Sequence, residues 1–247
     1  MSKAERLRDL EAAGFAVPPF AVVPAAAFDA LRAALPAPAT EAAILGAPLP
    51  AEVEDMVRTA LHALGPDANG PLAVRSSMAG EDGAHHAFAG QLDSFLNVGG
   101  EPAALAAVRA CWASAVGPRV AAYRAAHGLD EAPAAVEVVL QRMVQPEAAG
   151  VLFTADPVTG DAATLVVSAV AGLADALVRG EEPGQTWRID RATGTAERID
   201  GDGAPLLGER RLRELADVGA RVEALLGAAQ DIEFAIAGGR VWLLQAR

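Results

Sequence analysis

The order of hydrophobic and polar positions predicts a chain in which helices and strands are mixed. Apolar residues recur at helical spacing at residues 3–13, 24–35, 51–64, 101–127 and 209–226. Short apolar runs predict strands at residues 20–23, 72–75, 96–98, 136–144, 150–154 and 165–168. Hairpins are expected around Ala192-Thr193-Gly194 and Gly238-Gly239, where turn residues separate two strand-like runs. This mixture favours an α+β fold over a doubly wound parallel sheet.

The composition adds to this picture mainly by restricting what the core is made of. Of the 247 residues, 52% are hydrophobic but only 4% are aromatic, so Ala, Val and Leu must fill most of the core. The length is sufficient for one large domain or for two small lobes that share a cleft.

The net charge of −12 argues against nucleic acid and anionic membranes as binding partners. A surface this acidic repels nucleic acid and anionic membranes, so any phosphate ligand must be held by a local group of cations. The single cysteine, Cys111, excludes an internal disulfide and is expected to be a core thiol. The chain shows neither a signal peptide nor a run of about 20 apolar residues, and we expect a cytoplasmic protein.

Several common catalytic motifs are absent from the sequence. It has no G-x-x-x-x-G-K-[ST] loop, no H-E-x-x-H or paired C-x-x-C, and no G-x-S-x-G elbow. These absences argue against a P-loop enzyme, zinc chemistry and a serine hydrolase of that type.

An arginine at the end of an apolar strand is the first candidate for ligand binding. Arg75 follows Leu72-Ala73-Val74 and begins a segment rich in Ser and Gly that runs to Gln91. Burying an unpaired arginine is costly, and glycine lets backbone N–H groups approach phosphates closely. The segment can therefore bind phosphate, or it can be a surface loop in which Arg75 pairs with Glu81 or Asp82.

The last hairpin carries the second group of candidates, Glu233, Gln245 and Arg247. A carboxylate and an amide oxygen are hard ligands that suit Mg²⁺. A two-residue turn at Gly238-Gly239 would put Glu233 and Gln245 on opposite faces, so we predict an odd loop at residues 237–240 that puts them on one face. The alternative is that Glu233 is only a solvated edge-strand charge.

Extended motifs then resemble a known family. Seven segments occur in the family's order: A-G-F-A-V-P-P (13–19) after Lys3, V-R-S-S (74–77), F-A-G-Q-L-D-S-F-L-N-V (88–98), V-V-L-Q-R-M-V (138–144), A-G-V-L-F-T-A-D-P-V-T-G (149–160), Q-D-I-E-F-A-I (230–236) and L-L-Q-A-R (243–247). With them the chain resembles the nucleotide-binding part of phosphoenolpyruvate synthase, pyruvate phosphate dikinase and rifampin phosphotransferase. Together they span nearly the whole chain.

The resemblance implies an ATP-grasp fold of two lobes with the nucleotide in a cleft between them. The N-terminal lobe, with its phosphate-binding loop, would comprise residues 1–100, and the C-terminal lobe, with adenine and metal sites, residues 101–247. It also implies a role for each candidate. Lys3 and Arg75 would contact the ATP phosphates, and Ser94 and Gly90 would lie near them. Gln141, with the backbone of Met143 and Val144, would hold adenine. Glu233 and Gln245 would bind Mg²⁺, and Arg247 would steady the transferring phosphate.

The sequence departs from the family pattern in three places. The family usually has G-G-K before its first helix, whereas this chain reads Met1-Ser2-Lys3. The family's E-x-x-x-G-L-G-E segment stands here as residues 168–175, with Ser168 and Asp175 replacing the glutamates. The family's phosphohistidine and acceptor domains are not among these 247 residues, so we expect either a stand-alone component or one domain of a longer chain. His85 and His86 lack the family's carrier signature and are expected to be loop residues.

These features predict an AMP-forming, ATP-dependent phosphotransferase component. We expect it to bind Mg-ATP and to transfer the β-phosphoryl group to a histidine on a separate carrier protein or to a small-molecule acceptor. The alternative is a catalytically degenerate nucleotide-binding module that regulates or scaffolds a partner.

Overall fold

The computed structural model describes residues 1–65, 70–78, 82–83, 86–87, 93–126 and 135–247, and these form two compact units. Unit 1 comprises Met1–Glu5 and Pro19–Met143, and unit 2 comprises Arg6–Pro18 and Val144–Arg247. Helix α1 (Lys3–Ala12) has its first turn in unit 1 and its remainder in unit 2. It ends before Gly14, whose φ of +80° is readily adopted by glycine, as the sequence predicted.

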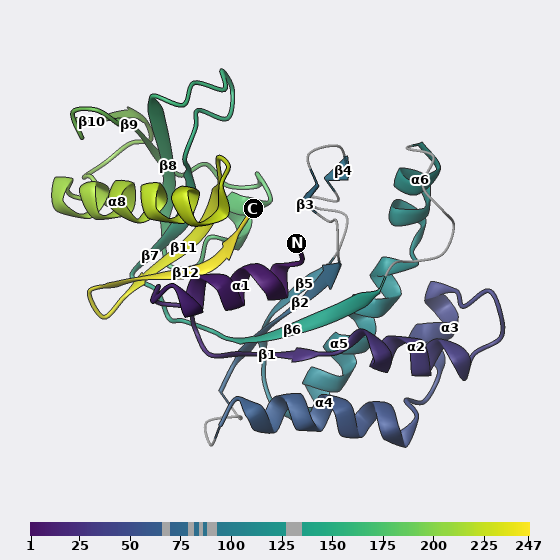
Figure 1. Cartoon of the computed structure of the whole chain (residues 1–247). Coiled ribbons are helices and arrows are strands. Elements are labelled where there is room, and N and C mark those ends of the chain that lie inside the picture. Colours follow the sequence, from purple (N-terminus) through teal and green to yellow (C-terminus); the bar gives the residue numbers. More distant parts are fainter. Residues whose placement is uncertain (66–69, 79–81, 84–85, 88–92, 127–134) are drawn as a thin grey trace. The chain divides into compact units, whose positions relative to one another are not determined.

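Unit 1 is built on a four-stranded sheet whose strand order is β1-β6-β2-β5, with antiparallel neighbours throughout (Figure 1). Its elements are β1 (Phe20–Val23), α2 (Ala25–Ala33), α3 (Glu41–Gly46), α4 (Ala51–Ala63), β2 (Leu72–Met78), β3 (Asp82–Gly83), β4 (His86–Ala87), β5 (Ser94–Val98), α5 (Glu101–Ala115), α6 (Pro118–Ala126) and β6 (Val136–Arg142). Strands β3 and β4 form a separate two-stranded ribbon.

Helices α2, α4 and α5 cover one face of this sheet. The covered face contributes Val74, Val138 and Leu140 to the core, where Phe28 stacks on Trp112 with ring centroids 5.7 Å apart. Cys111 is also buried there, and burial raises the pKa of its thiol to about 12, which agrees with the expected core thiol. The opposite face of the sheet is therefore the one left for polar chemistry.

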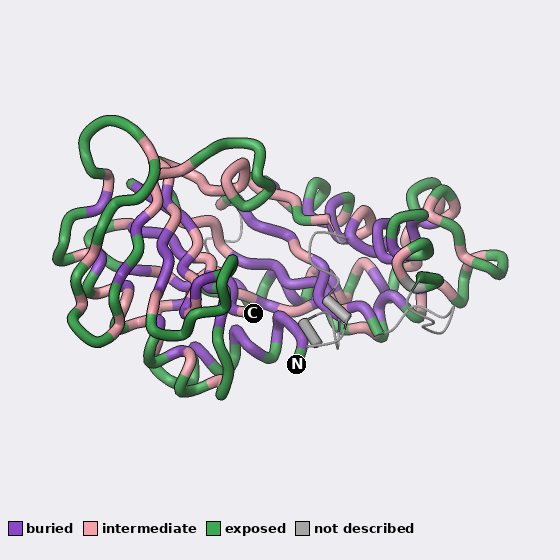
Figure 2. Tube along the Cα trace, turned by 90° about the horizontal axis from the view of Figure 1, so that it is seen from above, coloured by how far each residue is buried: buried purple, intermediate pink, exposed green. Residues whose placement is uncertain are grey.

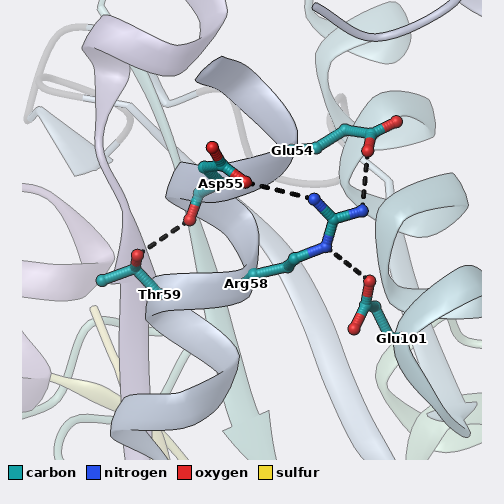
Figure 3. A network of polar contacts seen from close by, with 5 residues as sticks. All are labelled: Glu54, Asp55, Arg58, Thr59 and Glu101. Atoms are coloured by element: carbon teal, nitrogen blue, oxygen red, sulfur yellow. Dashed lines mark hydrogen bonds and ion pairs between the residues drawn. The ribbon is translucent and has the colours of Figure 1, made fainter. Parts of the chain in front are cut away.

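An exposed ion-pair network joins α4 to α5 at the surface of unit 1 (Figure 3). Arg58 donates to Glu101 at 2.7 Å, to Glu54 at 2.7 Å and to Asp55 at 3.2 Å. These hydrogen bonds, that to Glu101 first, raise the pKa of Arg58 above its ordinary value. The network is a structural tie between two helices and involves none of the predicted site residues.

Two helices of unit 1 differ from the pattern read in the sequence. The helix predicted over residues 101–127 is divided at Val116 and Gly117, because Pro118 disfavours helical backbone in the preceding residue and begins α6. Helix α3 was not predicted, although Thr40 caps it by accepting a 3.2 Å hydrogen bond from the Ala43 N–H.

Unit 2 is built on a six-stranded antiparallel sheet in the order β10-β9-β8-β7-β11-β12. Its elements after the α1 segment are β7 (Ala148–Phe153), β8 (Thr164–Ala171), α7 (Asp175–Val178), β9 (Gln185–Asp190), β10 (Ala196–Asp200), α8 (Glu209–Leu226), β11 (Asp231–Ala237) and β12 (Arg240–Ala246). Except for the short α7, the sequence pattern predicted an element or a hairpin at each of these places, with α8 at its observed bounds and β8 shorter, at residues 165–168.

Helix α8 packs on the unit 2 sheet through a stripe of residues at helical spacing, Leu212, Leu215, Gly219 and Val222. Gly219 permits close approach, since a Cβ there would lie 3.0 Å from a methyl group of Leu152. Figure 2 shows the buried positions concentrated in the interior of the chain trace, while most of the outermost loops are exposed. No helix in the part of the chain that the structure describes is long and apolar enough to span a membrane.

The division into units differs from the lobe boundary expected at residue 100. Strand β6 pairs with β1 and β2, and α5 packs on β2, so residues 101–143 belong with the N-terminal sheet. Gln141 and Met143, which the sequence placed in the C-terminal lobe, are consequently part of unit 1.

Candidate functional site

Three of the predicted residues lie on the face of the unit 1 sheet opposite its helices. Arg75 on β2 is paired directly with Ser94 on β5, and directly paired residues in an antiparallel sheet extend their side chains to the same face. Gln141 on β6 is paired with Ala73, two residues before Arg75, and so shares that face. The structure thus brings Arg75, Ser94 and Gln141 together on three adjacent strands.

Lys3 joins this group through the first turn of α1. Its Nζ donates a 3.0 Å hydrogen bond to the carbonyl oxygen of Ser76, the residue after Arg75. The Ala4 N–H donates to Ser77 Oγ at 3.2 Å, which holds the same turn against β2. Lys3 is only 5% exposed, so its position beside Arg75 is determined by folding and is not that of a freely moving terminal side chain.

The backbone after Gln141 limits how Met143 could contact adenine. The Arg142 N–H donates to Pro19 O at 2.9 Å, and the Met143 N–H donates to Pro71 O at 3.0 Å. Because its N–H is already engaged, Met143 could offer adenine only its carbonyl oxygen. Val144, which begins the second part of unit 2, would have to supply any backbone donor at this position.

The hairpin β11–β12 places Glu233 directly opposite Gln245, so the prediction that they share a face is confirmed. The predicted odd loop is wrong. Ala237 pairs with Arg240, and the turn consists of Gly238 and Gly239 alone, with φ values of +58° and +72°.

A β-bulge provides the change of parity that the odd loop was expected to provide. Phe234 pairs with Leu243, but Glu233 pairs with Gln245, which leaves Leu244 as the extra residue. With the observed turn and no bulge, Glu233 would face Leu244, and Gln245 would point into the core beside Ile232. The bulge therefore moves Gln245 onto the face of Glu233.

Ser168, one of the departures from the family motif, lies on the same face of the unit 2 sheet as Glu233. Glu233 pairs with Val151 on β7, and Val151 pairs with Ser168 on β8, so Ser168 stands in the same cross-strand row. Ser168 Oγ is 2.9 Å from Thr186 Oγ1 on β9. Where the family has a glutamate, this row carries a pair of neutral hydroxyl groups.

The strand ends next to Glu233 and Gln245 carry Asp231 and Arg247. Their backbones exchange two hydrogen bonds, from Asp231 N–H to Arg247 O at 2.8 Å and from Arg247 N–H to Asp231 O at 2.9 Å. Asp231 was not singled out in the sequence. Its position two residues before Glu233, which puts both carboxylates on one face of the strand, was the signal available.

The oxygen ligands at this hairpin fit a magnesium ion that also binds a nucleotide. No group of three or more His, Cys, Asp or Glu side chains among the described residues could hold a metal ion. Mg²⁺ commonly binds through one or two carboxylates together with substrate phosphates, and Glu233 with the Gln245 amide oxygen suits that pattern. Gly90, the remaining predicted residue, and His85 lie outside the described residues, as does much of the glycine-rich segment.

Asp156 organises the loop after β7 in the motif T-A-D-P-V-T-G. Its carboxylate accepts hydrogen bonds from the N–H groups of Thr159 at 3.0 Å and Val158 at 2.9 Å, and Arg188 lies 3.4 Å away. The two backbone donors, that of Thr159 first, hold the pKa of Asp156 below its ordinary value of 3.8. Asp156 therefore stabilises the fold in its charged form.

Protonation of Asp156 at acidic pH should lower the free energy of unfolding, and Asp156→Asn should reduce this dependence on pH. Since its pKa is lower in the folded state, its contribution is complete above about pH 4 and is lost as pH falls through the folded-state pKa. Asparagine can accept the same N–H bonds but does not titrate there. Urea unfolding between pH 7 and pH 3 should show a shallower loss of unfolding free energy for Asp156→Asn than for the exposed control Asp217→Asn. Equal slopes would contradict this assignment.

Comparison with known proteins identifies the family to which this chain belongs. Residues 29–205 match the family described as pyruvate phosphate dikinase, AMP/ATP-binding domain. The chain belongs to this family. Its fold is accordingly the α+β ATP-grasp fold that the sequence motifs implied. The matched range includes Arg75, Ser94 and Gln141, but Lys3 and the β11–β12 hairpin lie outside it.

One relative extends the match to nearly the whole chain. The chain is 35% identical to the prodigiosin synthesizing transferase PigC of Serratia marcescens, an alignment that covers 99% of this chain and 31% of PigC. It is 39% identical to a rifampicin phosphotransferase of a Streptomyces species, with coverage of 83% and 26%. The chain thus spans about a third or less of the lengths of these relatives.

A solved structure supports the fold alone. Crystalline PH1788 from Pyrococcus horikoshii Ot3 superimposes with a TM-score of 0.52 at 13% sequence identity, covering 100% of this chain and 89% of that one.

Proposed function

We propose that this member of the family binds Mg-ATP and starts an AMP-forming phosphotransfer. Nucleophilic attack on the β-phosphorus would break its bond to the oxygen that bridges to the α-phosphate, releasing AMP. The β-phosphoryl group would pass to a histidine of a carrier protein or to a small-molecule acceptor. It would at first still carry the γ-phosphoryl group. Attack of water or inorganic phosphate on the γ-phosphorus would then break its bond to the β–γ bridging oxygen, releasing phosphate or pyrophosphate and leaving the β-phosphoryl group on the acceptor.

The observation that carries this proposal is the bulge that pairs Glu233 with Gln245. A regular hairpin with the observed two-residue turn would pair Gln245 with Ile232 and turn its amide away from Glu233. A β-bulge disrupts the strand ladder locally, and such bulges are frequent next to active sites. Its effect here is to present two oxygen ligands side by side, which supports a metal-nucleotide site.

The other residues supply what phosphoryl transfer requires, namely positioning and charge neutralisation. Lys3 and Arg75 are cations on one face of unit 1, and Ser94 beside Arg75 adds a hydroxyl group. In unit 2, Arg247 adds a cation at the strand end that follows Gln245. Bound Mg²⁺ would neutralise the phosphates as charge develops on them. Each unit thus offers cations, which a chain of net charge −12 needs if it is to hold ATP.

A degenerate nucleotide-binding module is the second candidate, and the Ser168–Thr186 pair favours it. Ser168 replaces a family glutamate in the row that includes Glu233, so this face has one carboxylate fewer than the family motif provides. Such a protein would bind ATP without turnover.

Incubation with ATP and Mg²⁺, followed by chromatography of nucleotides, separates the two candidates. The reaction is run alone, with inorganic phosphate, with rifampicin as the acceptor class suggested by a relative's name, and with a histidine-bearing carrier domain. AMP formation with one of these supports the transferase. ATP binding by calorimetry with no AMP in any reaction supports the module, and absence of ATP binding overturns both.

A further inference from the structure

Arg6, a buried residue of α1, contacts the end of the β11–β12 hairpin within unit 2. It is 9% exposed, and its Nη1 donates to Gln230 Oε1 at 3.3 Å and to the carbonyl oxygen of Ala246 at 3.4 Å. Ala246 lies between Gln245 and Arg247, two residues of the proposed site. One guanidinium group therefore reaches both the residue that leads into β11 and the last residue of β12.

Several hydrogen bonds fix the position of Gln230, so it can transmit the contact from Arg6 to the start of β11. It is 4% exposed, and its backbone N–H donates to Thr154 Oγ1 at 2.7 Å, while the Thr154 N–H donates to Gln230 O at 2.9 Å. Its side-chain amide donates to the carbonyl oxygens of Ala228 at 2.9 Å and Ala229 at 3.0 Å. These contacts orient Oε1 as the acceptor for Arg6.

Thr154 in turn is anchored to α8 through Arg191. The Arg191 guanidinium donates to the Thr154 carbonyl oxygen and to Glu223 Oε2, the latter at 2.7 Å. Burial alone would raise the pKa of Glu223, but hydrogen bonds with Arg191 and Thr154 outweigh it, and the pKa lies below its ordinary value. A continuous polar network thus extends from Arg6 through Gln230 and Thr154 to Glu223 of α8.

We propose that Arg6 is a positioning residue for Gln245 and Arg247, an inference that rests on the proposed function of the hairpin. The bulge at Leu244 shifts the pairing of β12 with β11 by one residue, and Gln245 and Ala246 pair with Glu233 and Ile232 in the shifted register. The directions of Gln245 and Arg247 therefore depend on what holds this shifted strand end. The contacts at this strand end include the reciprocal backbone bonds of Arg247 with Asp231 and the contact of Arg6 with the Ala246 carbonyl.

Arginine suits this role better than lysine. Its planar group presents donors in a fixed fork, so it can serve two acceptors with one orientation, whereas a lysine ammonium is a flexible point charge. Its apolar stem can pack within the helix interface while the charged end reaches the polar network. The proposed action of Arg6 is through the strand end and requires no contact with ATP.

Amide hydrogen exchange of the nucleotide-free protein tests the positioning by itself. Arg6→Met keeps much of the stem and removes the donors, and Arg8→Met is the matched control because Arg8 is exposed on the same helix. Charge-assisted hydrogen bonds of this kind predict that exchange at Asp231, Ala246 and Arg247 becomes about 10-fold faster in Arg6→Met and stays unchanged in Arg8→Met. Unchanged exchange at these amides in folded Arg6→Met overturns the proposal.

Affinity for Mg-ATP, measured by calorimetry, tests the consequence for the site. We expect a loss of about 10-fold in Arg6→Met, partial rescue in Arg6→Lys, and none in Arg8→Met. A Gln230→Leu variant should lose affinity similarly, and the double variant should lose less than the product of the two single effects. Additive losses overturn the idea that Arg6 acts through Gln230. Should Arg6→Met fail to fold, Arg6→Lys carries both measurements, with smaller changes in the same direction.

The two experiments separate failure of this inference from failure of the proposed function. If the unaltered protein binds no Mg-ATP, the proposed function fails, while faster exchange in Arg6→Met still supports the hold on the strand end. If the unaltered protein binds Mg-ATP and neither exchange nor affinity changes in Arg6→Met, the proposed function stands and the role of Arg6 is overturned.

Discussion

Alanine in place of Glu233 should lower the rate of AMP formation from ATP by about 100-fold or more, the effect typical of losing one group that stabilises a charged transition state. Glu233 is the carboxylate of the pair that the bulge creates, and the amide of Gln245 cannot replace its charge. Without it, Mg²⁺ would be held mainly by the nucleotide. Rates are measured by chromatographic separation of AMP under saturating ATP with the acceptor that supports turnover.

Two further variants test whether the loss of activity in Glu233→Ala comes from the carboxylate at this position. Glu233→Gln keeps an oxygen ligand but removes the charge, so its rate should fall between those of the unaltered protein and Glu233→Ala, with partial recovery at higher Mg²⁺. Glu209→Ala removes an exposed carboxylate from the start of α8 and should leave the rate unchanged. A Glu233→Ala protein that folds normally and retains full activity would show that the hairpin is not the metal site.

Gly150→Ala should destabilise unit 2 by about 3 kcal/mol or more, at the upper end of what overpacking costs. Gly150 lies in β7 between β8 and β11, paired with Ala169 and Phe234. A Cβ there would overlap the carbonyl oxygen of Ser168 and lie 2.8 Å from the Ala169 Cα. These are backbone atoms of a paired strand, so no side-chain movement can relieve the clash.

Urea unfolding followed by circular dichroism measures the effect of Gly150→Ala. Gly208→Ala is the control, because its backbone is extended and a Cβ there would meet no atom within 4 Å. That variant should change the unfolding free energy by no more than about 1 kcal/mol. Gly150 also precedes Val151, which separates Glu233 from Ser168 in the cross-strand row, so the activity of Gly150→Ala should fall along with its stability. A change in unfolding free energy as small as that of the control would contradict the close approach of β7 and β8.

Local sequence patterns were sufficient for most of the elements. The spacing of Leu212, Leu215 and Val222 fits one face of α8, and Gly14 ends α1 where its backbone freedom is needed. These features depend on residues close together in the chain, so their physical causes can be read from a short window. The break at Pro118 belongs to the same class of signal, and the prediction of one long helix passed over it.

The lobe boundary required contacts between distant segments. Residues 136–142 read as a strand in either lobe, because an apolar run contains no information about its partners. Only the pairing of β6 with β1 and β2 assigns Gln141 to the sheet that carries Arg75.

For the site, the sequence by itself determined which residue types were present and in what order, enough to indicate family membership and to nominate Arg75, Glu233 and Gln245. It did not determine how the last two meet. A bulge is one extra residue in a pairing, and which residue is left over depends on the free energy of packing both faces of the sheet at once. Tertiary structure decided that Leu244 is that residue, that Gln245 therefore lies beside Glu233, and that Arg6 contacts the adjoining strand end, more than 200 residues away in sequence.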